Sequence, residues 1–556
     1  MIADRRPSGV AWIIGSVIAS LLVAVPVGVV LSSVFRSSEG VWSHLVDTRL
    51  VSYTSNTVVL AVSVCALAAC IGVPAAWLVT MHRFPGRRIL SWALLLPLAV
   101  PAYISAYALT DLLQFSGPVQ TWIRGMFDLQ AGGYWFPDMR TLGGAIVILA
   151  FALYPYIYFA ARIAFLEQSR SAIEASRTLG RGPIRTFFTV ALPLARPALV
   201  GGIMLVLMET VADFGAVEYC AVDTFATGIY RTWLGLESQV AAAQLSAVLL
   251  SALFLLIGLE WMLRRARRYH HTAVRCNRPQ QIPLGPVSRV LATLFCLVPL
   301  SIGFLLPAGR LIDLAISEGD ARAGSMLGGL VMTTSWLAGA AAVIAVLMAL
   351  LIGYAHRIHR NAMTSIASGI ARSGYAVPGP VIAIGLLVSL SWIDHLINDV
   401  SETVSDGGWK PGLIFTGSVI ALLIGYQTRF ITVSLSFVES GFSRIHRTLD
   451  DATRTLGAGP TRAFFGVHLP LLRSGLLAAA LIVFVDVVKE LPMTLMVRPF
   501  NFDTLAVRVY QLASDERLEE ASTAALAIIG VGMIPVMVLS RQIERNRQSQ
   551  PMKELQ

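Results

Sequence analysis

The chain has 556 residues, of which 55% are apolar and only 14% are charged, and its formal net charge is +10. Because this small number of charged residues cannot cover the surfaces of several soluble domains, the composition excludes a soluble protein and favours an integral membrane protein. The positive charge does not indicate nucleic acid binding, because the basic residues are concentrated in alternate loops between the apolar runs, as in membrane proteins.

Apolar runs long enough to cross a bilayer predict about twelve transmembrane helices, six in each half of the chain. The first run follows Arg5 and Arg6 and is too long for the apolar region of a signal peptide, so we expect it to be retained. The expected fold is an all-α polytopic membrane protein. The runs fall at 10–34, 53–80, 89–113, 141–166, 197–219, 239–263, 286–314, 327–355, 366–393, 412–438, 474–497 and 521–540.

Lysines and arginines gather in every second loop. The loop with Arg83, the linker at 264–289 and the C-terminal tail are rich in them, whereas Asp394 and Glu402 belong to an acidic cluster in an opposite loop. Because basic loops stay on the cytoplasmic side of the membrane, we expect both termini to be cytoplasmic.

A polar, arginine-rich segment returns in the second half of the chain. EASRTLGRGPIRTFFTVALPLAR at 174–196 matches DATRTLGAGPTRAFFGVHLPLLR at 451–473, a displacement of 451 − 174 = 277 residues. The tripeptide AVP at 99–101 recurs at the same offset. We therefore predict a tandem duplication, with transmembrane copies at 1–270 and 286–556 and a cytoplasmic linker at 271–285. Six spans per copy would orient both copies the same way in the membrane.

Each repeated segment is predicted to form a bend between two short helices, called here an elbow. Gly180 suits the left-handed conformation that ends a helix, and Pro183 suits the start of the next one, which we expect to end near Leu192 and Pro193. A DNA-reading helix-turn-helix is disfavoured because spans tether both ends of the segment. A passive loop is disfavoured because glycine, proline and phenylalanine recur at the same positions.

The elbows resemble the cytoplasmic EAA loop of permease subunits in binding-protein-dependent ABC importers. The second copy departs by Asp451 in place of glutamate, and both copies replace the second alanine, by Ser176 and Thr453. The matching positions are Glu174, Ala175, Gly180, Val190, Leu192 and Pro193 in the first copy, and Asp451, Ala452, Gly457, Val467, Leu469 and Pro470 in the second.

The fused two-copy design also resembles ferric iron importer permeases, through DFGAVEY in the first copy and KELPMTL in the second. The resemblance implies two tandem six-helix halves of the MetI-like type in a bacterial inner membrane. It implies that the elbows couple to a dimer of ABC ATP-binding subunits and that a periplasmic binding protein delivers the substrate. Import of thiamine or a phosphonate by the same architecture, and an ATP-independent channel, stay open as alternatives.

ATP is expected to be bound by partner subunits, and this chain is expected to bind no cofactor. A phosphate-binding loop needs glycine before its lysine, but Trp409, Val488 and Met552 precede the three lysines. An intramembrane enzyme is disfavoured because the histidines fall in loops, in elbows or at span ends. The five cysteines show no metal-ligand spacing, and metal ligands are left unassigned.

Four carboxylates fall inside apolar runs at equivalent positions. Glu209 and Asp213 lie four residues apart, and the 277 offset places Asp486 and Glu490 at the matching positions, next to Lys489. Each ionisable residue costs about 2.5 to 3.5 kcal/mol at the centre of a span, which favours a water-lined interior. We expect these five residues to line the translocation path or form its gate. Ion pairs that include Lys489, and docking on the periplasmic side, are the alternatives.

Overall fold

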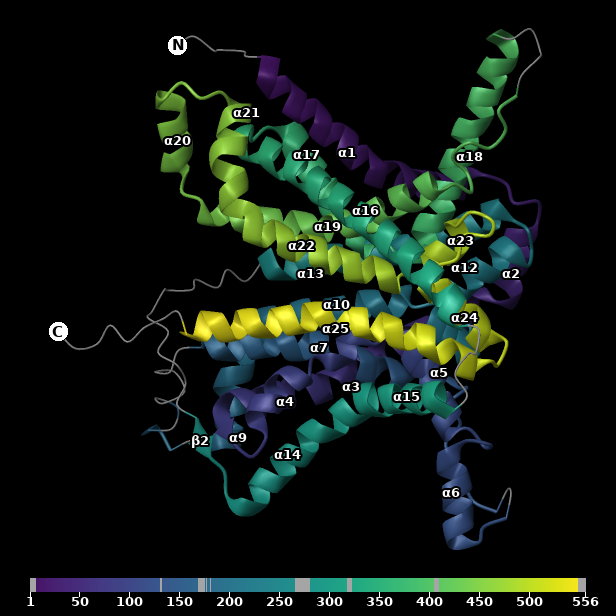
Figure 1. Ribbon diagram of the computed structural model, residues 1–556, viewed down its shortest axis with the longest axis vertical. Coiled ribbons are helices and arrows are strands. Elements are labelled where there is room, and N and C mark those ends of the chain that lie inside the picture. The colour runs from purple at the N-terminus through teal and green to yellow at the C-terminus, as the bar shows by residue number, and fades with distance from the viewer. Residues whose placement is uncertain are drawn as a thin grey trace, which may run out of the picture. The chain divides into compact units, whose positions relative to one another are not determined.

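The computed structural model of the protein describes residues 7–130, 133–168, 176, 178–180, 182–265, 281–317, 323–404 and 410–548. Within these ranges the regular structure is helical except for two strands of two residues, β1 (His82–Arg83) and β2 (Ile282–Pro283), which pair in parallel (Figure 1). The predicted all-α class is confirmed.

The helices follow the order of the expected spans. Those of the first copy are α1 (Pro7–Ser32), α2 (Val41–Thr48), α3 (Leu50–Met81), α4 (Arg87–Ala93), α5 (Ala102–Leu113), α6 (Pro118–Phe127), α7 (Leu142–Glu167), α9 (Pro183–Thr186), α10 (Leu192–Ala212), α11 (Gly215–Tyr219), α12 (Phe225–Leu234) and α13 (Gln239–Arg265). Those of the second copy are α14 (Pro286–Leu300), α15 (Leu306–Ser317), α16 (Ala323–Ile358), α17 (Ala362–Ser373), α18 (Gly379–Val404), α19 (Val419–Arg444), α20 (Arg447–Thr455), α21 (Pro460–Ala463), α22 (Leu469–Lys489), α23 (Pro492–Val497), α24 (Leu505–Ser514) and α25 (Leu518–Gln548).

Among the described residues, 11 helices are long and apolar enough to cross a membrane, and the number rises to 12 when one bent pair is counted as a span. The bent pair consists of Arg87–Ala99 and Ala102–Phe127, which meet at 95°. The predicted number of about twelve spans is therefore confirmed.

Two spans differ from the continuous helices expected at 89–113 and 366–393. Both break at the repeated AVP sequence, where Val100 and Val377 have extended backbone with ψ of 117° and 121°. The reason is the proline that follows each valine, because its ring disfavours helical backbone in the preceding residue. A proline that sequence analysis used only as a repeat marker thus divides the third span of each copy.

The chain forms two compact units that do not coincide with the tandem copies. Unit 1 comprises 1–48, 228–251 and 324–508, and unit 2 comprises 49–227, 252–323 and 509–556. The expected copy boundaries describe the duplication in sequence and stay a prediction, and linker residues 271–280 lie outside the described part of the chain.

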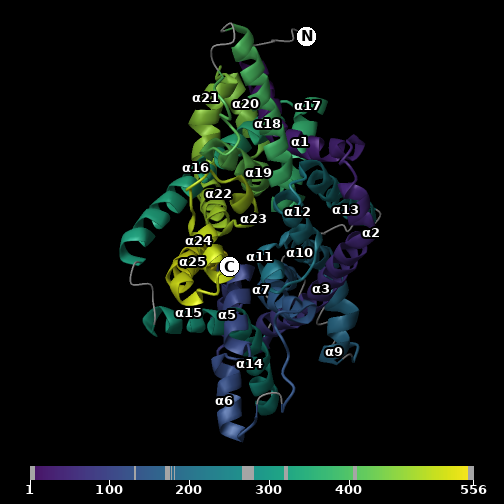
Figure 2. The same ribbon diagram turned by 90° about the vertical axis from the view of Figure 1, so that its right-hand side faces the viewer.

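The units differ from the copies because the first helix of each copy packs on helices of the other. In unit 1, α1 packs along α17 and α18, as Figures 1 and 2 show. The contact with α18 is close, because a Cβ atom at Gly385 would overlap the Pro26 carbonyl oxygen. In unit 2, α15 packs on α5 of the first copy as well as on α25 of its own copy, and an ion pair of 2.6 Å joins Arg310 to Asp111 of α5.

The centre of unit 2 is a bundle of α3, α7 and α10. Its apolar core includes Val64 and Ala68 of α3, Ile157 and Ala161 of α7 and Val206 of α10, all fully buried. Small side chains such as these alanines let helices approach closely inside a membrane. The helix that follows the first elbow is α10, so the bundle packs this helix against α3 and α7.

Candidate coupling elbows and membrane carboxylates

Glycine follows the first helix of the second elbow as expected, and the equivalent glycine of the first elbow has the same left-handed backbone. Gly180 has a φ of +77° and Gly457 a φ of +73°, both in the left-handed region where side chains are disfavoured. Nothing lies within 4 Å of a Cβ atom built at either glycine, so backbone conformation and not space selects glycine there. Glu174 and Ala175 of the first elbow lie outside the described residues. Asp451 and Ala452 lie exposed on α20.

The second helix of each elbow does not end near Leu192 and Pro193, as the sequence analysis expected. It continues through a π-helical turn, Phe187–Ala191 or Phe464–His468, into α10 or α22. Pro193 and Pro470 stand in the first turn of these long helices. Proline lacks the amide hydrogen that an α-helix needs, and the wider turn before it accommodates that loss. Each elbow is thus continuous with a transmembrane helix.

The inner side of each elbow packs through aromatic rings that are repeated at the 277 offset. In unit 2 the Trp77 ring lies 5.3 Å from that of Phe165 and 5.1 Å from that of Phe187. The equivalent rings in unit 1 belong to Tyr354, Phe442 and Phe464. There the distances from Tyr354 are 6.1 and 4.8 Å. These contacts fix each elbow to the second and fourth spans of its copy.

The outer side of each elbow exposes large apolar side chains. Leu179 is 78% exposed and Phe188 61%, and their counterparts Leu456 and Phe465 are 85% and 60% exposed. The same leucine and phenylalanine are therefore left uncovered in both copies. Exposed apolar side chains at equivalent positions are typical of a protein interface.

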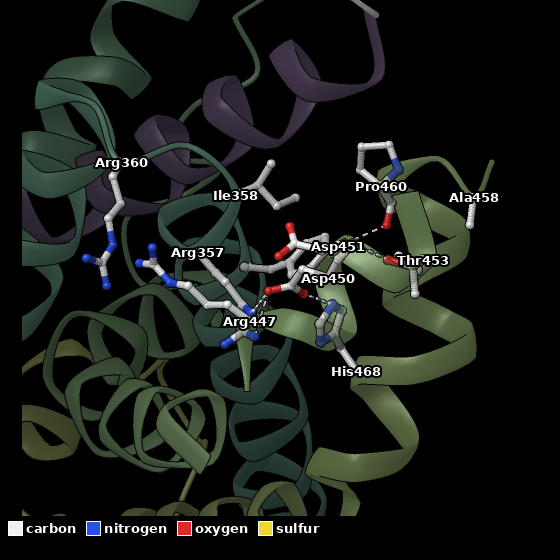
Figure 3. A pocket seen from close by; sticks show the side chains of 12 residues that line it. Arg357, Ile358, Arg360, Arg447, Asp450, Asp451, Thr453, Ala458, Pro460 and His468 are labelled. Atoms are coloured by element: carbon white, nitrogen blue, oxygen red, sulfur yellow. Dashed lines mark hydrogen bonds and ion pairs between the residues drawn. The ribbon is translucent and has the colours of Figure 1, made fainter. Parts of the chain in front are cut away.

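The second elbow has a polar anchor. Asp450 of α20 accepts hydrogen bonds from the Arg357 guanidinium at 2.7 and 3.1 Å, and its other oxygen lies 3.0 Å from Nε2 of the buried His468 (Figure 3). The Tyr354 hydroxyl donates to the Pro460 carbonyl at 2.6 Å. A pocket of about 420 Å³ lies beside these residues, with Arg360 also in its lining.

The first elbow lacks this anchor by sequence. The positions equivalent to Arg357, Asp450 and His468 hold Thr80, Ile173 and Ala191. The anchor was not predicted from the sequence, because the predicted elbow residues are those that the two copies share and the anchor appears only where they differ.

The membrane carboxylates mark a break in the fifth span of each copy. The runs expected at 197–219 and 474–497 instead end at Ala212 and Lys489, and short helices α11 and α23 follow. Asp213 Oδ1 accepts hydrogen bonds from the amides of Ala216 and Val217 at 3.0 and 3.1 Å. Each break is stabilised because a carboxylate caps the short helix that follows.

Glu490 plays the equivalent capping part in the second copy and is also paired with a cation. Its Oε1 accepts from the Met493 amide at 3.3 Å, and its Oε2 lies 2.8 Å from the Arg429 guanidinium. The two side chains of this ion pair are only 8% and 5% exposed. Arg429 was not predicted as a site residue, although an arginine inside the apolar run at 412–438 was the available signal.

The remaining residues assigned to the path are half-buried: Glu209 in α10, and Asp486 and Lys489 in α22. Glu209 and Asp213 belong to unit 2, whereas Asp486, Lys489 and Glu490 belong to unit 1. A shared opening lined by both sets therefore stays a prediction. Across the described ranges, no group of three His, Cys, Asp or Glu side chains is arranged to hold a metal ion.

The duplicated architecture agrees with a comparison to protein families. The family described as "Binding-protein-dependent transport system inner membrane component" matches residues 68–269 and 345–548, and the two matches begin 345 − 68 = 277 residues apart. They cover more than half of the chain, which therefore belongs to this family of inner-membrane permeases. The protein is a permease of a binding-protein-dependent ABC importer.

Individual relatives differ in their substrates. The chain is 26% identical to the Fe(3+)-transport system permease protein FbpB 2 of Haemophilus influenzae, over 89% of this chain and 90% of the relative. It is 26% identical to the sulfate transport system permease protein CysT of Escherichia coli, over 41% of this chain and 81% of the relative. It is 28% identical to the molybdenum transport system permease protein ModB of Haemophilus influenzae, over 35% and 84% respectively.

Proposed function

We propose that this permease forms the translocation path for ferric iron. The observation that carries the proposal is the similarity to the iron permease across both copies in one chain. The sulfate and molybdenum relatives match less than half of this chain. The carboxylates at the breaks of the fifth and eleventh spans support a cationic substrate, because hard cations prefer oxygen ligands.

The elbows are proposed to be the contacts with a dimer of ATP-binding subunits. Leu179 and Phe188, with Leu456 and Phe465, supply two equivalent apolar surfaces, which suit a partner that is itself two-fold symmetric. Because each elbow continues into a transmembrane helix, movement of the partner would be passed directly to the span. ATP is bound by those subunits, this chain binds no cofactor, and a periplasmic binding protein delivers the substrate.

An oxyanion is the competing substrate, favoured by the sulfate and molybdenum relatives. The experiment that separates the two uses the permease reconstituted in nanodiscs with ATP-binding subunits. Binding proteins loaded with ferric iron, sulfate or molybdate are added in turn, and ATP hydrolysis is measured. Stimulation by the iron-loaded protein alone is the expected result. Stimulation by an oxyanion-loaded protein alone would replace iron as the substrate.

Neutralising the membrane carboxylates is expected to lower import without loss of the ATP-binding subunits. The changes Glu209→Gln, Asp213→Asn, Asp486→Asn and Glu490→Gln keep side-chain shape and remove charge. Glu490→Gln also removes one partner of the buried pair with Arg429, so for this variant a lower melting temperature is expected as well. Uptake of ⁵⁵Fe by proteoliposomes and co-purification of the ATP-binding subunits measure the two effects. If a change instead raises ATP hydrolysis without substrate, and Lys489→Met reverses it, the residues form a gate. Wild-type uptake by all four variants would contradict both assignments.

Both termini and the linker are proposed to be cytoplasmic. Cys276 lies in the linker, outside the described residues, and is expected to react with an impermeant maleimide only after the inner membrane is opened. A matched control is Trp135→Cys in a Cys276→Ser background, because Trp135 is 85% exposed in the loop before α7, which is expected to face the periplasm. That cysteine should react in intact spheroplasts. The reverse labelling pattern would invert the topology.

A further inference from the structure

Helix α6 turns polar side chains toward its own loop. Gln120, its buried residue, donates a hydrogen bond to the Leu113 carbonyl at 2.8 Å and accepts one from the Tyr134 hydroxyl at 2.7 Å. Arg124 donates to the same hydroxyl at 3.1 Å and to the Phe115 carbonyl at 2.9 Å. The amide and the guanidinium therefore find their partners within the chain and not in solvent.

The outward side of α6 carries large apolar side chains. Trp122 is 64% exposed, and Met126 and Phe127 are each 62% exposed. The apolar residues of the helix recur at 119, 122, 123, 126 and 127, a spacing that places them on one face. A helix on a soluble protein covers such a face and exposes its polar one. The opposite arrangement, with polar groups directed to the protein and apolar groups outward, is typical of a helix in contact with lipid.

The position of α6 suits the surface of a membrane. With 10 residues the helix is about 15 Å long, half of the length that a span requires. It follows α5 and runs crosswise to the span α7 of the same unit, projecting away from it (Figures 1 and 2). A helix crosswise to a span lies along the bilayer plane. The loop that contains it joins the third and fourth spans and is expected on the periplasmic side.

We propose that α6 is an interfacial helix that anchors the first copy in the periplasmic leaflet, with Trp122 and Met126 against the lipid chains. Tryptophan and tyrosine are enriched at this level of the membrane, and an arginine on the polar face can remain near the headgroups. A binding protein that docks and leaves would uncover the apolar face between deliveries, whereas lipid covers it at all times. The inference does not depend on which substrate is imported.

The second copy has no equivalent anchor. Helix α18 continues unbroken through the positions that form α6 in the first copy. There Asp399 and Thr403 stand at the positions of Trp122 and Met126. A carboxylate and a hydroxyl suit water and not lipid chains. The second copy therefore supplies a matched control for the first.

The test places single cysteines in the permease with Cys70→Ser and Cys276→Ser, because the other three cysteines are buried. Trp122→Cys and Met126→Cys report on the apolar face. Thr121→Cys reports on the polar face of the same helix, where the threonine hydroxyl lies beside the guanidinium. Each cysteine is spin-labelled in nanodiscs of phosphatidylethanolamine and phosphatidylglycerol. Electron paramagnetic resonance then compares collisions with oxygen, which enters lipid, and with a neutral nickel chelate, which stays in water.

We expect the labels at 122 and 126 to collide mainly with oxygen and to lie about 5 to 10 Å below the headgroup surface. Labels at 121 and at Asp399→Cys should collide mainly with nickel. Nickel contact at 122 and 126 equal to that at 121 would show an apolar face in water and overturn the inference. Loss of that nickel contact only after an iron-loaded binding protein is added would identify a docking surface and overturn it as well. Both contrary results leave the proposed function intact.

Discussion

Replacement of Arg429 by methionine is expected to destabilise the protein more than any other single change considered for it. The guanidinium lies 2.8 Å from Glu490 Oε2, and both side chains are almost completely buried. Removing one partner leaves an uncompensated charge inside the protein, which typically costs about 3 to 5 kcal/mol. The expected result is a clear fall in the melting temperature of the purified permease in detergent and a lower yield in the membrane.

Two further variants decide whether the buried charge is the cause. Arg429→Met combined with Glu490→Met removes both charges and should recover most of the melting temperature, because apolar replacements of a buried pair are often neutral or stabilising. Arg517→Met is the exposed control, because its pair with Glu520 is 54% and 30% exposed and such pairs contribute about 0 to 1 kcal/mol. Equal losses for Arg429→Met and Arg517→Met would contradict the assignment of a buried ion pair.

Valine in place of Gly457 is expected to uncouple the permease from ATP hydrolysis while leaving its stability nearly unchanged. The φ of +73° is unfavourable for any residue with a Cβ atom and most of all for a β-branched one. The cost of about 1 to 2 kcal/mol falls on an exposed bend, so we expect the elbow to lose its shape locally. Co-purification of ATP-binding subunits and import should both fall by about tenfold, whereas the melting temperature should not move.

Gly459 supplies the matched control for this change. It stands two residues away, has an ordinary φ of −71°, and likewise has nothing within 4 Å of a built Cβ atom. Gly459→Val should therefore retain coupling, and Gly457→Asn should retain most of it, because asparagine tolerates left-handed backbone. The pair Gly180→Val and Gly182→Val repeats the comparison in the first elbow. If valine at 459 were as harmful as valine at 457, bulk at the interface and not backbone conformation would explain the effect.

Local chemistry made part of this protein predictable. The spans follow from apolar length, and the left-handed glycines follow from the helix-ending pattern that both elbows share. The breaks at Val100 and Val377 were predictable in principle, because each valine precedes a proline, but a hydropathy count passes over a single residue of that kind. The continuation past Pro193 was mispredicted because a π-helical turn before a proline has no simple sequence signal.

Contacts between distant residues were not predictable from one sequence. Nothing near Glu490 in the chain points to Arg429, which is 61 residues away and on another helix. The packing of α1 on α17 and α18 likewise depends on the three-dimensional path of the chain. The apolar content of a helix indicates that it is covered, but it does not indicate which element covers it. The two pairs of carboxylates occupy equivalent positions in the sequence, but their surroundings differ, because position 429 is an arginine and the equivalent position 152 is an alanine.

The proposed function is import of ferric iron driven by ATP hydrolysis in partner subunits. The most direct measurement is ⁵⁵Fe accumulation in proteoliposomes that contain the permease with its ATP-binding subunits, with an iron-loaded binding protein outside the vesicles and ATP inside. We expect accumulation with ATP, none with a non-hydrolysable analogue, and a loss of about tenfold with Gly457→Val but not Gly459→Val. Equal iron entry with and without ATP would indicate a channel and contradict the account.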